Sequence, residues 1–269
     1  MPLTITALLP HSPLLIPEIG RSNLAFLAKT NEAYNQISKK LKDSNTETLI
    51  IISPHGPSGN DSFIINVAPE MVIDFKDFGY ISPKIQFQGD AFLADQIQRD
   101  LRPEFSLQLI SEGVLDSGSA VPLYLFKELN PGLKVIIISP ATDSEFSEQL
   151  LFGEKIYDVI NKTDKNIAVI ASGDLSHRLK KKSPGGYSPK GAKFDNRLIE
   201  YLSAPETAAE NILKMDKKLI LDAGECGLKP IIILLGLLKN IIWQPEILAY
   251  QTDFGIGYLS LEFKSNEKI

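Results

Sequence analysis

The stretch TLIIISPHGP, Thr48 to Pro57, decides how this chain folds. Its apolar first half, rich in β-branched residues, is typical of a strand buried on both faces of a sheet. The strand must end where Pro54 lacks an N–H group and where Gly56 favours a turn. His55 therefore comes at the carboxyl end of a central strand, which is where open α/β sheets bind their ligands.

The bulk composition is that of an ordinary globular protein. The 269 residues are enough for one large α/β domain. The chain is 43% hydrophobic and 23% charged, and its net charge of −5 argues against a nucleic-acid binder, which needs a basic surface. The sequence has no run of about 18 apolar residues, so we expect no membrane span. The one cysteine cannot form an internal disulfide, and a cytoplasmic, reducing compartment is expected.

The same strand form recurs along the chain. LTITALLP (3–10) runs into His11, and NIAVIASGDLSH (166–177) ends in His177, whereas LKVIIISPAT (133–142) ends without a histidine. Segments with helical spacing separate these strands, which is typical of parallel strands joined by crossover helices. We therefore predict an α/β fold, a single domain over residues 1–269 with a central, mostly parallel or mixed sheet flanked by helices.

Other segments have weaker patterns. We expect a helix over 22–42 that begins at an N-capping Ser22, and a helix over 121–129 with its proline in the first turn. Segments 63–69 and 71–75 are interpreted as two strands of an edge hairpin. The remaining expected elements are a basic loop over 178–193, a buried helix over 229–238, and antiparallel strands over 247–251 and 256–263.

Four side chains with metal-binding or acid–base chemistry lie in Gly-, Pro- or Ser-rich turns: His11, His55, His177 and Glu225. Two imidazoles and a carboxylate form the facial triad of non-haem Fe(II) oxygenases, which leaves adjacent metal positions for a bidentate substrate and O₂. A further histidine can take and return a proton near neutral pH. The pattern therefore predicts a metal site at the carboxyl ends of the strands.

Each of these residues also has an ordinary explanation. A single histidine in a loop is usually a polar surface residue, and Glu225 could simply cap the buried helix that follows it. A zinc hydrolase also uses two histidines and a glutamate. The placement of all three histidines after apolar strands favours one shared site.

Six motifs give the chain a resemblance to a known family. They are PHSPLL (10–15), SPHGP (53–57), SGDLSH (172–177), GGYSPKGAKFD (185–195), GECGLKP (224–230) and FGIGYL (254–259). In this order they resemble the LigB-type class III extradiol dioxygenases over nearly the whole chain. Within that family the chain is most similar to LigB-type proteins grouped with AMME-domain and radical-SAM proteins, which are distant relatives of the Memo proteins.

The resemblance implies a function and a site. It implies that His11, His55 and Glu225 hold Fe(II), with Mn or Zn as alternative metals, and that His177 is the acid/base. The expected reaction is the opening of a small aromatic diol by O₂. Many ring-cleaving members carry an LDHG motif where this chain has Leu115 to Gly118, so Ser117 replaces a histidine that assists proton delivery.

A second function stays open beside ring cleavage. Serine cannot titrate near neutral pH, and Ser117 therefore favours a Memo-like metal-binding protein that works with protein partners and cleaves no ring. Memo-type relatives have a cysteine near the carboxylate ligand. Cys226 follows Glu225 here, but we expect Glu225 to bind the metal and Cys226 to be a small buried residue.

The basic loop supplies the remaining expectations. Tyr187 and Ser117 are predicted to contact the substrate, and the cations between Arg178 and Lys193 could attract an anionic ring or form an ordinary solvated loop. The partners left open are a homo-oligomer and a protein with an AMME-type or radical-SAM domain. No nucleic acid and no membrane are expected as partners.

Overall fold

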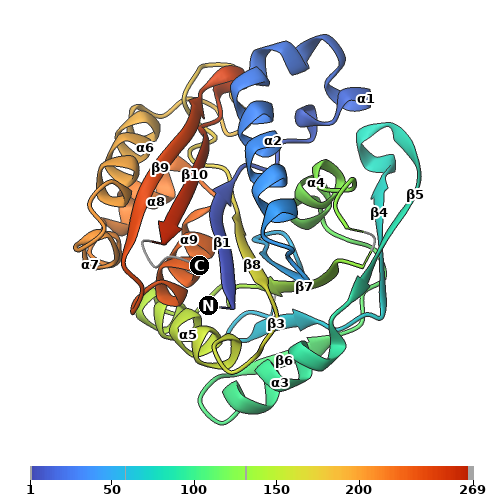
Figure 1. Cartoon of the computed structure of the whole chain (residues 1–269). Helices are drawn as coiled ribbons and strands as arrows, with labels where there is room; N and C mark the ends of the chain where they lie inside the picture. Colours follow the sequence, from blue (N-terminus) through green and yellow to red (C-terminus); the bar gives the residue numbers. More distant parts are fainter. Residues whose placement is uncertain (1, 58, 131, 266–269) are drawn as a thin grey trace.

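A mixed sheet of ten strands runs through the middle of the molecule, as the computed structural model of residues 2–57, 59–130 and 132–265 shows (Figure 1). The strands are β1 (Leu3–Leu9), β2 (Thr48–Ile52), β3 (Phe63–Asn66), β4 (Glu70–Phe75), β5 (Tyr80–Gly89), β6 (Leu107–Ile110), β7 (Lys134–Ser139), β8 (Ile167–Ser172), β9 (Trp243–Gln251) and β10 (Tyr258–Ser265). The helices are α1 (Pro17–Gly20), α2 (Ala28–Asp43), α3 (Ala91–Leu101), α4 (Ser117–Leu125), α5 (Phe146–Ile160), α6 (Pro189–Leu202), α7 (Ala208–Leu213), α8 (Lys217–Ala223) and α9 (Leu228–Leu237).

The strand order places the predicted site strands side by side. The main path runs β4-β5-β7-β2-β8-β1-β10-β9, and β3 joins β7 to β6 outside it. Strands β7, β2, β8 and β1 are parallel neighbours, so their carboxyl ends meet at one edge of the sheet. Strand β8 lies between β1 and β2, and Ile170 pairs with Ala7 on one side and Ile51 on the other. The predicted central sheet, mostly parallel or mixed and flanked by helices, is therefore confirmed, and the sheet is mixed.

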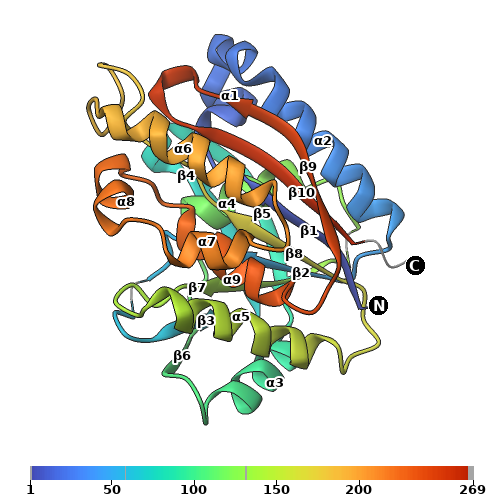
Figure 2. The same cartoon turned by 90° about the vertical axis from the view of Figure 1, so that its left-hand side faces the viewer.

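Helices cover both faces of this sheet because the central strands are apolar on both sides. In β2, Ile50 and Ile52 join one buried cluster, whereas Leu49 and Ile51 join the other. The first cluster packs against α3 and α5 to α9, which lie together on one face (Figure 2). The second packs against α2 and α4. Alternation within one strand thus builds a three-layer molecule.

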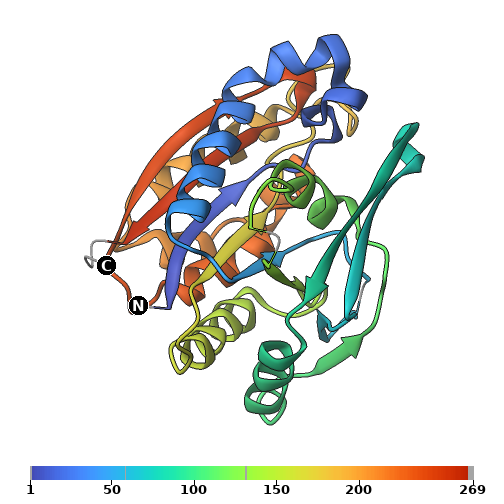
Figure 3. The ribbon, with the colours of Figure 1, turned by 45° about the vertical axis from the view of Figure 1, so that its right-hand side comes forward.

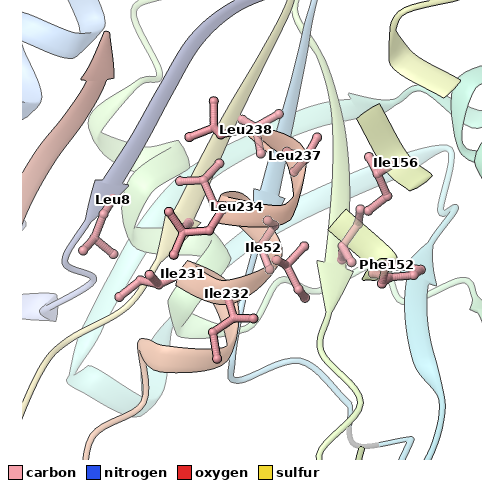
Figure 4. Packing of buried hydrophobic residues seen from close by; sticks show 14 of the residues in the cluster. Leu8, Ile52, Phe152, Ile156, Ile231, Ile232, Leu234, Leu237 and Leu238 are labelled. Carbon is pink, nitrogen blue, oxygen red and sulfur yellow. The ribbon is translucent and has the colours of Figure 1, made fainter. Parts of the chain in front are cut away.

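Helix α9 packs on the sheet beside α5, and both helices contribute to one buried cluster (Figure 4). Ile231 and Leu234 of α9 lie near the sheet residues Leu8 and Ile52, and Phe152 of α5 belongs to the same cluster. A Cβ atom on Gly236 would lie 2.0 Å from the Leu150 carbonyl oxygen, so only glycine allows the two helices to approach this closely. Helix α9 follows directly after the Glu225–Cys226 turn, so this packing lies next to that turn in the chain.

The strands after β2 pair differently from the prediction. The predicted hairpin of 63–69 and 71–75 is wrong: β3 pairs with β6 and β7, and β4 pairs with β5 in a hairpin that extends from the body (Figure 3). Strand β5 contains Pro83, which discourages a strand prediction. The proline is accommodated because β5 contacts β7 only through Gln88 and Gly89.

Two helices begin at other residues than predicted. Helix α2 begins at Ala28 without a side-chain cap, since a 3₁₀ helix over Arg21–Leu27 precedes it and Ser22 is no cap. Helix α4 begins earlier, at Ser117, because the Asp116 side chain caps it by accepting a hydrogen bond from the Ser119 N–H. The proline of α4 is therefore inside the helix and not in its first turn. Within the described residues, no helix is both long and apolar enough to cross a membrane.

Candidate functional site

Two of the predicted metal ligands meet at the carboxyl edge of the sheet. His11 follows β1 and is almost completely buried, whereas His55 follows β2 and is exposed. Their Nε2 atoms are 3.0 Å apart, and the two rings are nearly perpendicular, at 82°. Partial desolvation by the surrounding residues and the neighbouring His11 lower the pKa of His55, which favours its neutral, metal-binding form.

The end of β8 holds His11 in place. The His11 Nδ1 atom lies 3.0 Å from the hydroxyl oxygen of Ser172, the last residue of β8. The backbone N–H of His11 donates to the Asp174 carboxylate at 3.1 Å. Both partners come from SGDLSH, and both are buried. Asp174 was not among the predicted site residues, although its place three residues before His177 in SGDLSH is a signal that the sequence carries.

His177 faces the same carboxylate from the other side. Its Nε2 lies 3.8 Å from Asp174 Oδ2, and its Nδ1 bonds the Gly224 carbonyl oxygen at 2.7 Å. Burial alone would lower the pKa of His177, but Asp174 outweighs it and the net pKa is raised. Burial also acts to raise the pKa of Asp174, and its two histidine neighbours bring it below its usual value instead. An ionised Asp174 can therefore stabilise an imidazolium at His177.

The Glu225–Cys226 turn, which joins α8 to α9, contributes a sulfur atom to the site. Cys226 Sγ lies 3.6 Å from His11 Nε2. Among the described residues, two groups could each surround a metal ion, with all donor atoms within 4.8 Å of one another: His11, His55 and Cys226, and Asp174, His177 and Cys226. Cys226 is half-buried and not the fully buried residue that we expected. Its thiol pKa is raised well above its usual value by burial.

Glu225 makes a different contact in this structure. Its carboxylate accepts a hydrogen bond from the Leu228 N–H at 2.6 Å, at the start of α9. Burial raises the pKa of Glu225 to about 7, although that hydrogen bond works against the rise. Neither group of candidate ligands includes Glu225. Glu225 thus has the capping contact that we considered as its ordinary role, and its role as a ligand stays a prediction.

Ser117 and Tyr187, the predicted substrate contacts, lie at the margins. Ser117 is the first residue of α4 and is half-buried, and Tyr187 is 60% exposed. The loop that carries Tyr187 folds back on the site, because Gly185 N–H donates to the His177 carbonyl oxygen at 3.1 Å. Its last residues, from Pro189, belong to helix α6 and not to a loop as we predicted. Substrate contact by Ser117 and Tyr187 stays a prediction.

Two cavities border the histidines and the Cys226 turn. A cavity of about 300 Å³ is lined by His55 together with residues of β3 and of the segment before α4. A second, also of about 300 Å³, is lined by Glu225, Cys226, Lys229 and apolar residues that include Phe146. Volumes of this size suit a small molecule with one ring. The candidate metal ligands therefore border spaces that a small aromatic ligand could enter.

Comparison with known proteins identifies the family. A family model described as the catalytic LigB subunit of aromatic ring-opening dioxygenase matches residues 5–259. This chain belongs to the LigB family. All four of the predicted ligand and acid/base residues, His11, His55, His177 and Glu225, lie within the LigB match.

Relatives of this LigB chain include a dioxygenase. The Clostridium acetobutylicum protein CA_C1420 is 31% identical over 276 residues, which cover 97% of this chain and 58% of that protein. This chain therefore spans little more than half the length of the clostridial relative. The 3,4-dihydroxyphenylacetate 2,3-dioxygenase of Escherichia coli is 25% identical over 215 residues, which cover 74% of this chain and 75% of that enzyme.

A solved structure shares the fold of this chain over nearly its whole length. The uncharacterized protein JW3007 from Escherichia coli K12 superposes with a TM-score of 0.70 and covers 96% of this chain and 99% of its own. The two sequences are only 14% identical, so this likeness concerns the fold alone.

Proposed function

We propose that this chain is an Fe(II)-dependent dioxygenase-like enzyme that opens a catechol-like aromatic ring with O₂. The observation that carries the proposal is the meeting of His11 and His55, whose Nε2 atoms lie 3.0 Å apart in a chain of the LigB family. Two nitrogens bound to one metal at about 2.1 Å and at right angles to each other would be separated by ~3.0 Å. The geometry thus fits one shared ion, with Mn or Zn as alternatives to iron.

The third ligand would come from the Glu225–Cys226 turn. A Glu225 carboxylate would complete the facial triad predicted from the sequence. Cys226 is the neighbour whose donor atom already faces His11, at 3.6 Å. Thiolate ligation would favour Zn or a softer metal state over the oxygen-rich site of an extradiol enzyme. Glu225→Gln and Cys226→Ser separate the two possibilities, because the true ligand is the residue whose loss weakens Fe(II) binding in an anaerobic titration.

His177 is the proposed acid/base. When bound, Fe(II) would supply binding positions for both diol oxygens and for O₂. The Gly224 carbonyl has no proton to give, so the His177 Nδ1 must carry one, and Nε2 is left to take the proton of a substrate hydroxyl. Asp174, 3.8 Å from that nitrogen, would stabilise the resulting imidazolium until the proton is returned. The cavities beside His55 and Cys226 would hold the ring.

The decisive experiment combines metal binding with turnover. Anaerobically purified protein is analysed for iron, manganese and zinc, titrated with Fe(II), and then exposed to O₂ with a panel of catechols. We expect Fe(II) binding that His55→Ala abolishes, and a ring-fission chromophore from at least one catechol. Full iron occupancy in His55→Ala would refute the ligand assignment, and Fe(II) binding without ring fission of any catechol would refute the reaction.

The setting of the enzyme is part of the same proposal. Cys226 is a free thiol beside the candidate ligands, and a reducing cytoplasm would keep it reduced. An AMME-domain or radical-SAM partner, and a homo-oligomer, stay predictions. Co-purification of the full chain and its molar mass in solution would test them.

A further inference from the structure

The His11 ring is linked to helix α4 by a chain of two buried hydrogen bonds. The first joins His11 Nδ1 to the Ser172 hydroxyl oxygen at 3.0 Å. In the second, the same hydroxyl donates to the carbonyl oxygen of Gly118 at 2.6 Å. His11 is 4% exposed and Ser172 is fully buried, so water does not compete with either bond.

The donor–acceptor direction of these two hydrogen bonds defines which nitrogen of His11 carries the proton. A carbonyl oxygen can only accept, so the single hydroxyl proton of Ser172 is committed to Gly118. The Ser172 oxygen can then only accept from His11, and Nδ1 must carry a proton. In a neutral imidazole the other nitrogen, Nε2, then has the free lone pair. That is the nitrogen which faces His55 and Cys226.

A proline explains why the Gly118 carbonyl is available. In a regular helix this oxygen would accept the N–H group four residues later, at position 122. Pro122 occupies that position inside α4 and has no N–H group. The carbonyl is therefore free to accept the Ser172 hydroxyl, and the proline that we expected in the first turn of the helix has a consequence at the histidine.

The start of α4 is itself fixed to the His55 turn. Asp116 accepts hydrogen bonds from the Ser119 N–H and from the Ser53 hydroxyl, at 3.1 and 2.5 Å. The Ser53 oxygen in turn lies 3.3 Å from the backbone N–H of His55. A Cβ atom on Gly118 would lie 2.4 Å from that same oxygen, so the contact requires glycine. Helix α4 thus contacts the supports of both histidines.

We propose that Ser172 is a positioning residue that holds His11 in the Nδ1-protonated tautomer, with the Gly118 carbonyl at the start of α4 as its anchor. The inference rests on the proposed role of His11 as a metal ligand. It gives the backbone carbonyl of Gly118 a role in metal binding. Without the hydroxyl, the ring can rotate or place its proton on Nε2, where it would block the metal.

Two measurements test the proposal, one of them without metal. The ¹⁵N chemical shifts of the histidine rings in metal-free protein report the tautomer directly, and we expect a protonated Nδ1 at His11. In Ser172→Ala we expect a mixture of tautomers. We also expect the dissociation constant for Fe(II), measured anaerobically, to be 10- to 100-fold larger than in the wild type. The matched control is Ser260→Ala in β10, because Ser260 is fully buried and its hydroxyl has no partner among the described residues.

The outcomes separate this inference from the proposed function. A protonated Nε2 at His11 in the wild-type protein overturns the tautomer assignment, even if Ser172→Ala does not fold. A folded Ser172→Ala that binds Fe(II) as tightly as Ser260→Ala overturns the positioning role. If His11→Ala itself keeps full Fe(II) affinity, the metal-ligand assignment fails, while the ¹⁵N shifts still decide the tautomer.

Discussion

Replacing Asp195 with asparagine should change stability relative to the wild type in a pH-dependent way. The difference in free energy of unfolding between Asp195→Asn and the wild type should be more favourable to the variant at neutral pH than at acidic pH. Asp195 is fully buried in α6 and accepts hydrogen bonds from the Ser176 N–H at 2.9 Å and the Tyr250 hydroxyl at 2.8 Å. Burial raises its pKa to about 6, although both hydrogen bonds act to lower it. Asparagine keeps an acceptor for Ser176 and cannot ionise.

The magnitude follows from the difference between the folded and unfolded chains. The pKa of an aspartate in the unfolded chain is about 3.9, so the carboxyl of Asp195 keeps its proton in the folded protein over about two pH units in which the unfolded chain has lost it. Folded protein therefore binds more protons, and stability falls as pH rises from about 4 to about 6. At about 1.4 kcal/mol per unit, the total loss from this one group is about 3 kcal/mol, and it is complete at about pH 7.

Urea denaturation at several pH values between 4 and 8 measures this effect. We expect the free energy of unfolding of Asp195→Asn, minus that of the wild type, to rise by about 2 kcal/mol between pH 4 and pH 7. The matched control is Asp158→Asn, which removes an exposed carboxylate from α5. A difference between Asp195→Asn and wild type that stays constant over this pH range would refute the raised pKa and its cause.

Three further changes test packing and chemistry. Gly236→Ala should reduce the free energy of unfolding by about 3 kcal/mol in urea, because its Cβ would lie 2.0 Å from the Leu150 carbonyl oxygen and force α5 from α9. Asp90→Ala should cost about 2 kcal/mol and lower the melting temperature, because this buried side chain caps α3 and binds the Lys165 ammonium at 2.5 Å. His177→Gln should leave the Fe(II) dissociation constant within a few-fold of wild type but reduce ring opening 10²- to 10⁴-fold, and an equal loss of Fe(II) affinity would make His177 a ligand instead.

The central sheet could be predicted because local composition decides it. A strand such as TLIIIS is apolar on both faces, so it is stable only where helices cover both sides of the sheet. Its place in the centre of the sheet can therefore be predicted from the sequence. Pairing could not be predicted in the same way. The pairing of β3 depends on how β6 and β7 approach it in space. Strand β5 was not predicted because Pro83 argues against a strand.

The candidate site divides along the same line. His11 and His55 could be found because the end of a parallel strand predicts both their position and their neighbours. The direction of the side chains in the Glu225–Cys226 turn could not be predicted. These two residues are adjacent, and only the turn's backbone decides whether the Glu225 oxygen or the Cys226 sulfur faces His11. The contacts of Ser172 could not be predicted from the sequence either. Its hydroxyl donates to the Gly118 carbonyl oxygen, which is available because Pro122 has no N–H group.

The place of β8 has a consequence for how the protein is made. Strands β1 and β2 leave the ribosome early, yet they are joined in the sheet only through β8, which begins at Ile167. The two histidines therefore gain their common frame only after β8 has been synthesised, and Cys226 arrives later still. A nascent chain thus exposes His11 and His55 as separate imidazoles, and the candidate donor set assembles only after residue 226 has been synthesised.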